Sequence, residues 1–96
     1  MFLVTLHRSG PRWNPERPLE EQSGWPAHAH YMDDLVHAGF VVLAGPLADE
    51  YRVILVVDAH TEDDVRATLA RDPWSGTHLR VAAVEPWTIR LDGRRT

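Results

Sequence analysis

The chain has 96 residues, which is enough for one domain and too few for two. Its formal net charge of −4 argues against nucleic acid or an anionic membrane as its main partner. It has no cysteine, which excludes disulfides, zinc–thiolate sites and cysteine nucleophiles. No apolar stretch approaches the roughly 20 residues of a membrane span, and the first residues lack the pattern of a signal peptide, so we predict a soluble cytoplasmic protein.

The first residues divide into a strand and a long loop. Residues 2–7 read FLVTLH, an alternation that predicts a strand. Residues 8–22 carry prolines at positions 11, 15 and 18, which cannot share one helix, so we predict a loop. A loop of this length in a compact domain is often a lid or a binding loop.

The middle of the chain predicts a helix and a hairpin. The helix should begin near Ser23, a good N-cap, accept Pro26 in its first turn and end at Gly39. Residues 40–47 then form a second predicted strand. A short polar step leads into a third strand over residues 51–59, so the two strands are expected to form a hairpin.

The last part of the chain predicts one more helix and one more strand. Thr61 is the expected N-cap of a helix that runs to about Arg71 and is stopped by Asp72-Pro73. Residues 78–92 form the last predicted strand. One face of that strand carries Leu79, Val81, Ala83, Trp87, Ile89 and Leu91. Residues 93–96 are expected to be a frayed tail, so the single domain spans residues 1–92.

The element order β-α-β-β-α-β predicts an α+β protein of ferredoxin-like arrangement, with a four-stranded antiparallel sheet. Two helices cover only one face of such a sheet. The third strand, however, is apolar on both faces, whereas a strand with one wet face should alternate. A second copy of the chain is the simplest cover for the other face, which predicts a homodimer. The alternative is a monomer with a small exposed apolar patch.

The stretch WPAHAHYMDDLVHAGF, residues 25–40, is rich in histidine and aspartate, and helical phase separates these residues into two groups. At roughly 100° per residue, His28 falls near the middle of the apolar stripe. The opposite, wet face carries His30, Asp33, Asp34 and His37. Such a face has metal-ligand spacing, but a solvated helix face is far commoner, so we predict no metal.

Asp72 is the second polar residue that phase turns inward. It follows Val65 and Leu69 at the i, i+4, i+7 spacing of one helix face. Because both helices pack on the same side of the sheet, His28 and Asp72 are expected to converge, and a carboxylate there would orient the imidazole and favour its protonated form. Two plainer interpretations stay open: a neutral core histidine bound to a carbonyl, and an aspartate in a turn before proline.

The run WPAHAHYMDDLVHAGFVVLAGPL, the helix end LARDPW and the final VEPWTI resemble the YCII (YciI-like) family. The resemblance covers roughly residues 23–92, while the proline-rich stretch 10–18 has no counterpart in the family. It implies a dimeric α+β barrel in which His28 and Asp72 form an active-site dyad. Enzymes similar to this family include a dehydrochlorinase of a chlorinated hydroxyhydroquinone. The wider superfamily includes a muconolactone isomerase.

The resemblance and the residues together suggest an enzyme without a cofactor, acting on a small cyclic or aromatic molecule by isomerisation or elimination. Gly45 would let the substrate approach the backbone, Pro46 is a further candidate for substrate binding, and Trp25 and Trp74 would wall the pocket. The alternative is a non-catalytic dimer that binds a small ligand or another protein. Haem binding through a histidine is disfavoured, because so short a chain leaves little room for haem.

Overall fold

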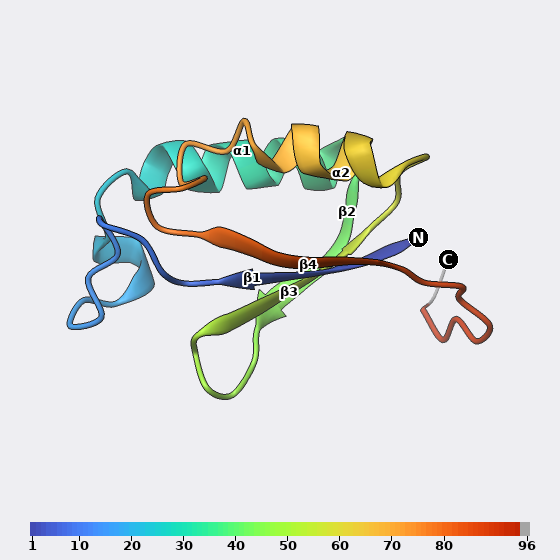
Figure 1. The fold of residues 1–96 in the computed structure, drawn as a ribbon, viewed down its shortest axis with the longest axis horizontal. Helices are drawn as coiled ribbons and strands as arrows, with labels where there is room; N and C mark the ends of the chain where they lie inside the picture. Colours follow the sequence, from blue (N-terminus) through green and yellow to red (C-terminus); the bar gives the residue numbers. More distant parts are fainter. Residues whose placement is uncertain (95–96) are drawn as a thin grey trace.

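A computed structural model describes residues 1–94 of the chain. It is an α+β fold with two α-helices and an open, four-stranded antiparallel sheet, which confirms this part of the predicted fold class. Figure 1 shows both helices on one face of the sheet. The elements are β1 (Phe2–His7), the 3-10 helix η1 (Leu19–Glu21), α1 (Trp25–His37), β2 (Val41–Pro46), β3 (Arg52–Val57), α2 (Glu62–Leu69) and β4 (Arg80–Pro86).

The strand order in the sheet is β2-β3-β1-β4, with β1 and β3 in the interior. The register pairs Val4 of β1 with Leu55 of β3, and both side chains are almost fully buried under the helices. Directly opposed residues of antiparallel strands share a face, so the alternation in β1 defines the helix-covered side of the whole sheet. The core on this side contains Phe2, Val4, Leu6, Val41, Leu55, Val57, Val65, Leu69, Trp74, Leu79 and Val84.

The last strand is shorter than the sequence predicts, and its alternation is interrupted. It ends at Pro86, and the predicted continuation over residues 87–92 is wrong. The cause is the length of its partner: Phe2, the first residue of β1, is already paired with Pro86. A register shift opposite Thr5 and Leu6 leaves Ala82 as an extra residue, which is a β-bulge. After this bulge the buried residue of β4 is Val84, which was not on the predicted apolar face. The residues predicted to share one face therefore do not share it. Of the predicted tail 93–96, residues 95–96 lie outside the described part.

The predicted loop over residues 8–22 is confirmed, apart from the single 3-10 turn η1. The buried side chain of Gln22 holds this loop together. It accepts a hydrogen bond from the backbone N–H of Asn14 at 3.0 Å and donates to the carbonyls of Asn14 and Arg17. A loop has no strand pairing to satisfy its backbone groups, and the Gln22 side chain satisfies three of them instead. This segment is therefore a fixed part of the fold.

The face of the sheet away from the helices carries an apolar patch, although Thr5 of β1 and Glu85 of β4 also lie on it. Ile54 and Val56 of β3 lie on it, and they are flanked by Leu43, which is 57% exposed, and by Trp87, which is 45% exposed. The single chain therefore leaves this face uncovered, as the sequence predicts. Of the helices formed by residues 1–94, none has both the length and the apolar character to cross a membrane.

Candidate active site around His28 and Asp72

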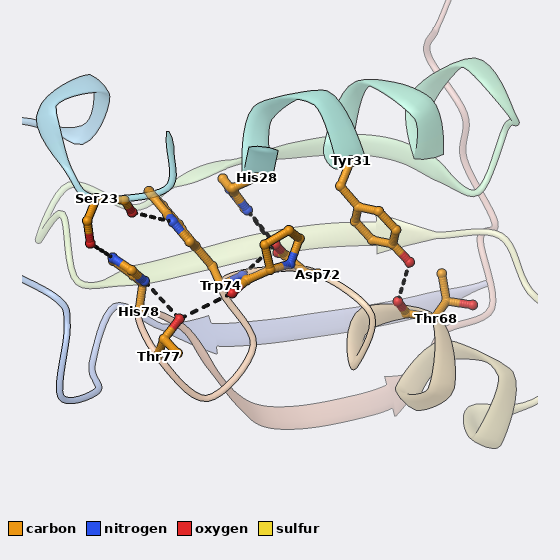
Figure 2. Close-up of polar contacts among 9 residues, drawn as sticks. Ser23, His28, Tyr31, Thr68, Asp72, Trp74, Thr77 and His78 are labelled. Carbon is orange, nitrogen blue, oxygen red and sulfur yellow. Dashed lines mark hydrogen bonds and ion pairs between the residues drawn. The ribbon is translucent and has the colours of Figure 1, made fainter. Parts of the chain in front are cut away.

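His28 and Asp72 meet on the helix-covered side of the sheet, as the phase of both helices predicts. His28 lies in the first turn of α1 and is the only buried residue of that helix. Asp72 lies three residues beyond the end of α2. The imidazole Nδ1 is 2.8 Å from each of the two carboxylate oxygens, and both residues are buried. Figure 2 shows the pair between α1 and the segment that follows α2.

The contact determines which nitrogen of His28 carries the proton. An ionised carboxylate only accepts hydrogen bonds, so Nδ1–H is the donor and Asp72 the acceptor. In the neutral ring the lone pair then belongs to Nε2. Nε2 has no hydrogen-bond partner among residues 1–94, and no unpartnered polar side-chain atom of this part of the chain is fully buried, so Nε2 is not completely enclosed although His28 is only 8% exposed. This is the arrangement that proton transfer at Nε2 requires.

Asp72 also has a local structural role, in agreement with the plainer interpretation of this residue. Its Oδ1 accepts a hydrogen bond from the backbone N–H of Trp74 at 2.9 Å, which closes a turn over Pro73. Its carbonyl accepts from the N–H of Ser75 at 2.8 Å. The turn therefore fixes the position of the carboxylate independently of His28. Closing the turn and contacting His28 are compatible roles of Asp72.

Trp74 is placed between two histidine rings. Its indole stacks on the His28 imidazole with 4.1 Å between ring centroids and an angle of 5° between the planes. On the other face the His78 ring lies at 4.6 Å and 15°. Trp74 is only 1% exposed and thus lies behind the imidazole instead of lining an open pocket. Trp25 is half-buried, with its ring 5.8 Å from that of His28.

His78 is a buried residue of this cluster that the sequence interpretation missed. Its Nε2 lies 3.0 Å from the Ser23 hydroxyl, and its Nδ1 lies 2.9 Å from the Thr77 hydroxyl, as Figure 2 shows. Burial is the main cause that lowers the pKa of His78 below 6.5, with Arg12 and His28 adding to it. Both ring nitrogens are used and the ring is neutral, so His78 is a structural histidine. No pattern in the sequence marked it.

Ser23 is engaged by this cluster, which explains why it is not the N-cap of α1. Its hydroxyl contacts His78, and its carbonyl accepts the indole N–H of Trp74 at 2.9 Å. The N-cap is Gly24 in the left-handed region, with φ of 73° and no side-chain cap. A Cβ at Gly24 would lie 3.3 Å from the indole nitrogen. The prediction that Ser23 caps the helix is therefore wrong.

Stability should fall as the pH drops below about 6.5, because the pKa of His78 is lower in the folded chain than in the unfolded chain. The unfolded state then binds the extra proton, and one such group contributes a slope of at most about 1.4 kcal/mol per pH unit. Urea unfolding of the wild type and of His78→Gln between pH 7 and pH 5 measures this effect. The variant should show a smaller decline, and identical slopes would contradict the prediction.

The other predicted site residues lie elsewhere. Gly45 pairs with Ile54 and so lies on the open face of the sheet, opposite to the helices. Pro46 lies at the end of the edge strand β2 and lines a groove with residues of the 8–22 loop. On the exposed face of α1, His30 contacts Asp34 at 3.5 Å. Within residues 1–94 there is no group of three or more side chains placed to hold a metal ion.

A hollow of about 20 Å³ borders the carboxylate side of the pair, between Asp72, Leu69 and Leu79. This is room for roughly one water molecule. An organic substrate would have to approach His28 from the Nε2 side.

The chain matches no protein-family model, and a search of curated proteins finds no significant match. The resemblance to the YCII family thus depends on the short motifs given above.

Proposed function

We propose that the protein is an enzyme that moves a proton on a small cyclic or aromatic molecule. The observation that carries this proposal is the buried contact of His28 Nδ1 with both oxygens of Asp72 at 2.8 Å. It leaves Nε2 as the one nitrogen of the ring that can exchange a proton with a ligand. Asp72 orients the ring and stabilises its charge, and Trp74 holds its plane.

The reaction class follows from this chemistry together with the resemblance to the YCII family. His28 Nε2 takes a proton from a carbon atom of the substrate, and the electron pair of the broken C–H bond forms a double bond. In an elimination, a leaving group such as chloride departs with its own electron pair. In an isomerisation, an existing double bond shifts its electron pair to another carbon as the new double bond forms, and the protonated His28 returns the proton to that carbon. Neither reaction needs a cofactor, because no net oxidation takes place.

The family resemblance also suggests that two chains of ferredoxin-like arrangement form a dimeric barrel. The support for this proposal is the apolar open face of the sheet, with Leu43 57% exposed. Burying such a face against its symmetry mate removes apolar surface from water in both chains. In such a dimer the second chain would also supply walls for a pocket.

A non-catalytic dimer that binds a ligand away from this pair, or another protein, is the second candidate. One observation favours it: the hollow beside the pair has a volume of about 20 Å³, which is far below the size of an organic ligand. In this candidate the His28–Asp72 pair only joins α1 to the segment after α2.

Nitrogen NMR of the imidazole rings separates the two candidates. In the enzyme, Nδ1 of His28 should stay protonated while Nε2 gains a proton as the pH falls. Asp72→Asn should change the ring nitrogen signals of His28, because a neutral amide replaces the carboxylate that accepts the Nδ1 proton. The exposed His37 is the control, and its ring signals should be identical in both proteins.

If Nε2 of His28 takes up no proton before the protein unfolds in acid, the ring is a packed core residue and the binding module is favoured. If Nε2 takes up a proton and Asp72→Asn changes the ring signals of His28, the second step is a screen of cyclic substrates. There, His28→Gln should reduce turnover by about a hundred- to ten-thousandfold, the contribution of a positioned acid or base.

A further inference from the structure

A groove of about 620 Å³ lies between the 8–22 loop and the turn that joins β2 to β3. Neither His28 nor Asp72 is among its lining residues. Its volume is within the range of small-molecule sites. The groove is lined by two aromatic rings, one leucine, three prolines, two arginines and three acidic residues. The residues that matter here are Arg8, Trp13, Leu19, Glu20, Glu50 and Tyr51.

The walls of the groove are ordered before any ligand binds. The Gln22 side chain fixes the loop wall through its hydrogen bonds to Asn14 and Arg17. On the opposite wall, the N–H of Glu50 donates to the carbonyl of Leu47 at 2.9 Å, and Asp49 accepts hydrogen bonds from Arg52. A preformed site loses little conformational entropy when it binds a ligand.

Arg8 is the unusual group in this groove, because it is a buried cation with little to neutralise it. Its side chain is only 8% exposed. Its nearest carboxylate, that of Glu50, is 3.5 Å away on a side chain that is 71% exposed. Such a pair compensates a buried charge poorly. The guanidinium otherwise donates from Nη1 to the Glu50 carbonyl at 3.0 Å and lies 5.4 Å from the centre of the Trp13 ring.

The backbone at Glu50 points its carbonyl at Arg8. Glu50 is the only residue other than glycine with a positive φ in the described chain, and its φ is 59°. This conformation is strained for a residue with a side chain, and such strain persists where the surrounding structure requires it. In this conformation the Glu50 carbonyl accepts a hydrogen bond from Nη1, so one edge of the Arg8 guanidinium is bound to the backbone. Arg8 lines the groove, and no polar side-chain atom in residues 1–94 is both fully buried and without a partner, so the remaining N–H groups of Arg8 are not completely enclosed.

We infer that this groove binds a small organic acid, with one carboxylate on the Arg8 guanidinium and a flat apolar body between Trp13 and Tyr51. A guanidinium matches the planar geometry of a carboxylate and pairs with it through two hydrogen bonds. The carboxyl groups of Glu20 and Glu50 line the same groove, so they repel polyanions such as nucleotides more strongly than an acid with a single negative charge.

Titration with benzoate, followed by NMR of the wild-type protein, tests the inference. Benzoate should shift the indole N–H of Trp13 and the side-chain N–H of Arg8. Benzamide, which has the same shape without the charge, should bind at least about tenfold more weakly, because the charge-assisted pair is lost. Equal shifts with both compounds, or no shift at tens of millimolar benzoate, would overturn the inference.

Two arginine variants localise the effect. Arg8→Gln should remove the preference for benzoate over benzamide. Arg17→Gln is the matched control and should keep it, because Arg17 lines the same groove but is 59% exposed and paired with Glu21. If Arg8→Gln binds benzoate as well as the wild type does, the site is not at Arg8. Should that variant fail to fold, the comparison of the two compounds on the wild type still decides. None of these results bears on the proposed role of His28.

Discussion

Replacing Trp74 with alanine should lower the free energy of unfolding by about 3–5 kcal/mol, as is usual when a buried tryptophan is removed. The indole is 1% exposed, stacks on two imidazoles and donates its N–H to the Ser23 carbonyl. Truncation leaves a cavity, an unpaired carbonyl and two rings without a partner. Urea unfolding followed by the fluorescence of the three remaining tryptophans measures the loss.

Trp74→Phe is the matched variant. Phenylalanine keeps a flat ring between His28 and His78 and loses only volume and the N–H donor, so it should recover at least half of the stability that alanine loses. If the two variants are equally unstable, the hydrogen bond to Ser23 is more important than the stack. A loss below about 1 kcal/mol in Trp74→Ala would mean that the stack contributes little to the folded state.

Leu43→Glu should weaken the proposed dimer by at least about a hundredfold. Leu43 is 57% exposed on the open face of the sheet, and a twofold axis brings any substitution there into the interface twice. Two buried, unpaired carboxylates cost far more than the lost leucine contacts. Sedimentation at micromolar concentration should show twice the monomer mass for the wild type and the monomer mass for Leu43→Glu.

Val36→Glu is the control for this experiment. Val36 is 51% exposed on α1, in the layer on the other side of the sheet, so the same change there should leave the mass unaltered. A wild-type protein that sediments as a monomer at every concentration would contradict the dimer and leave the open face uncovered. Dissociation by Val36→Glu but not by Leu43→Glu would place the interface on the helices instead.

Helical periodicity predicted the inward direction of His28 and, when the phase of the second helix is continued past its end, of Asp72. The inward phase of His28 and of Asp72 follows from the spacing of neighbouring apolar residues, and the structure confirms both as buried. This works because the angle between successive residues of a helix is a local property of the backbone. The second helix also begins as predicted, with the Thr61 side chain accepting the Asp64 N–H.

Register is a property of two strands, and the sequence of one strand does not contain it. The bulge at Ala82 and the end of β4 at Pro86 depend on where β1 begins. The alternation of β4 therefore predicted a face that the sheet does not have. Similarly, serine is a residue type that often caps helices. The hydroxyl and the carbonyl of Ser23, however, are hydrogen-bonded to His78 and Trp74, which are more than fifty residues away.

The sequence by itself determined the order of the elements, the open apolar face and the inward direction of His28 and Asp72, because each depends on patterns within a few residues. Only the tertiary structure decided that Trp74 lies between two histidines, that His78 is neutral, and that Arg8 lines a groove away from the pair. These features join residues that are distant in the chain, such as Arg8 and Glu50 at a separation of 42. The physical reason is that propensity and periodicity act along the chain, whereas stacking, desolvation and charge depend on which segments fold against each other.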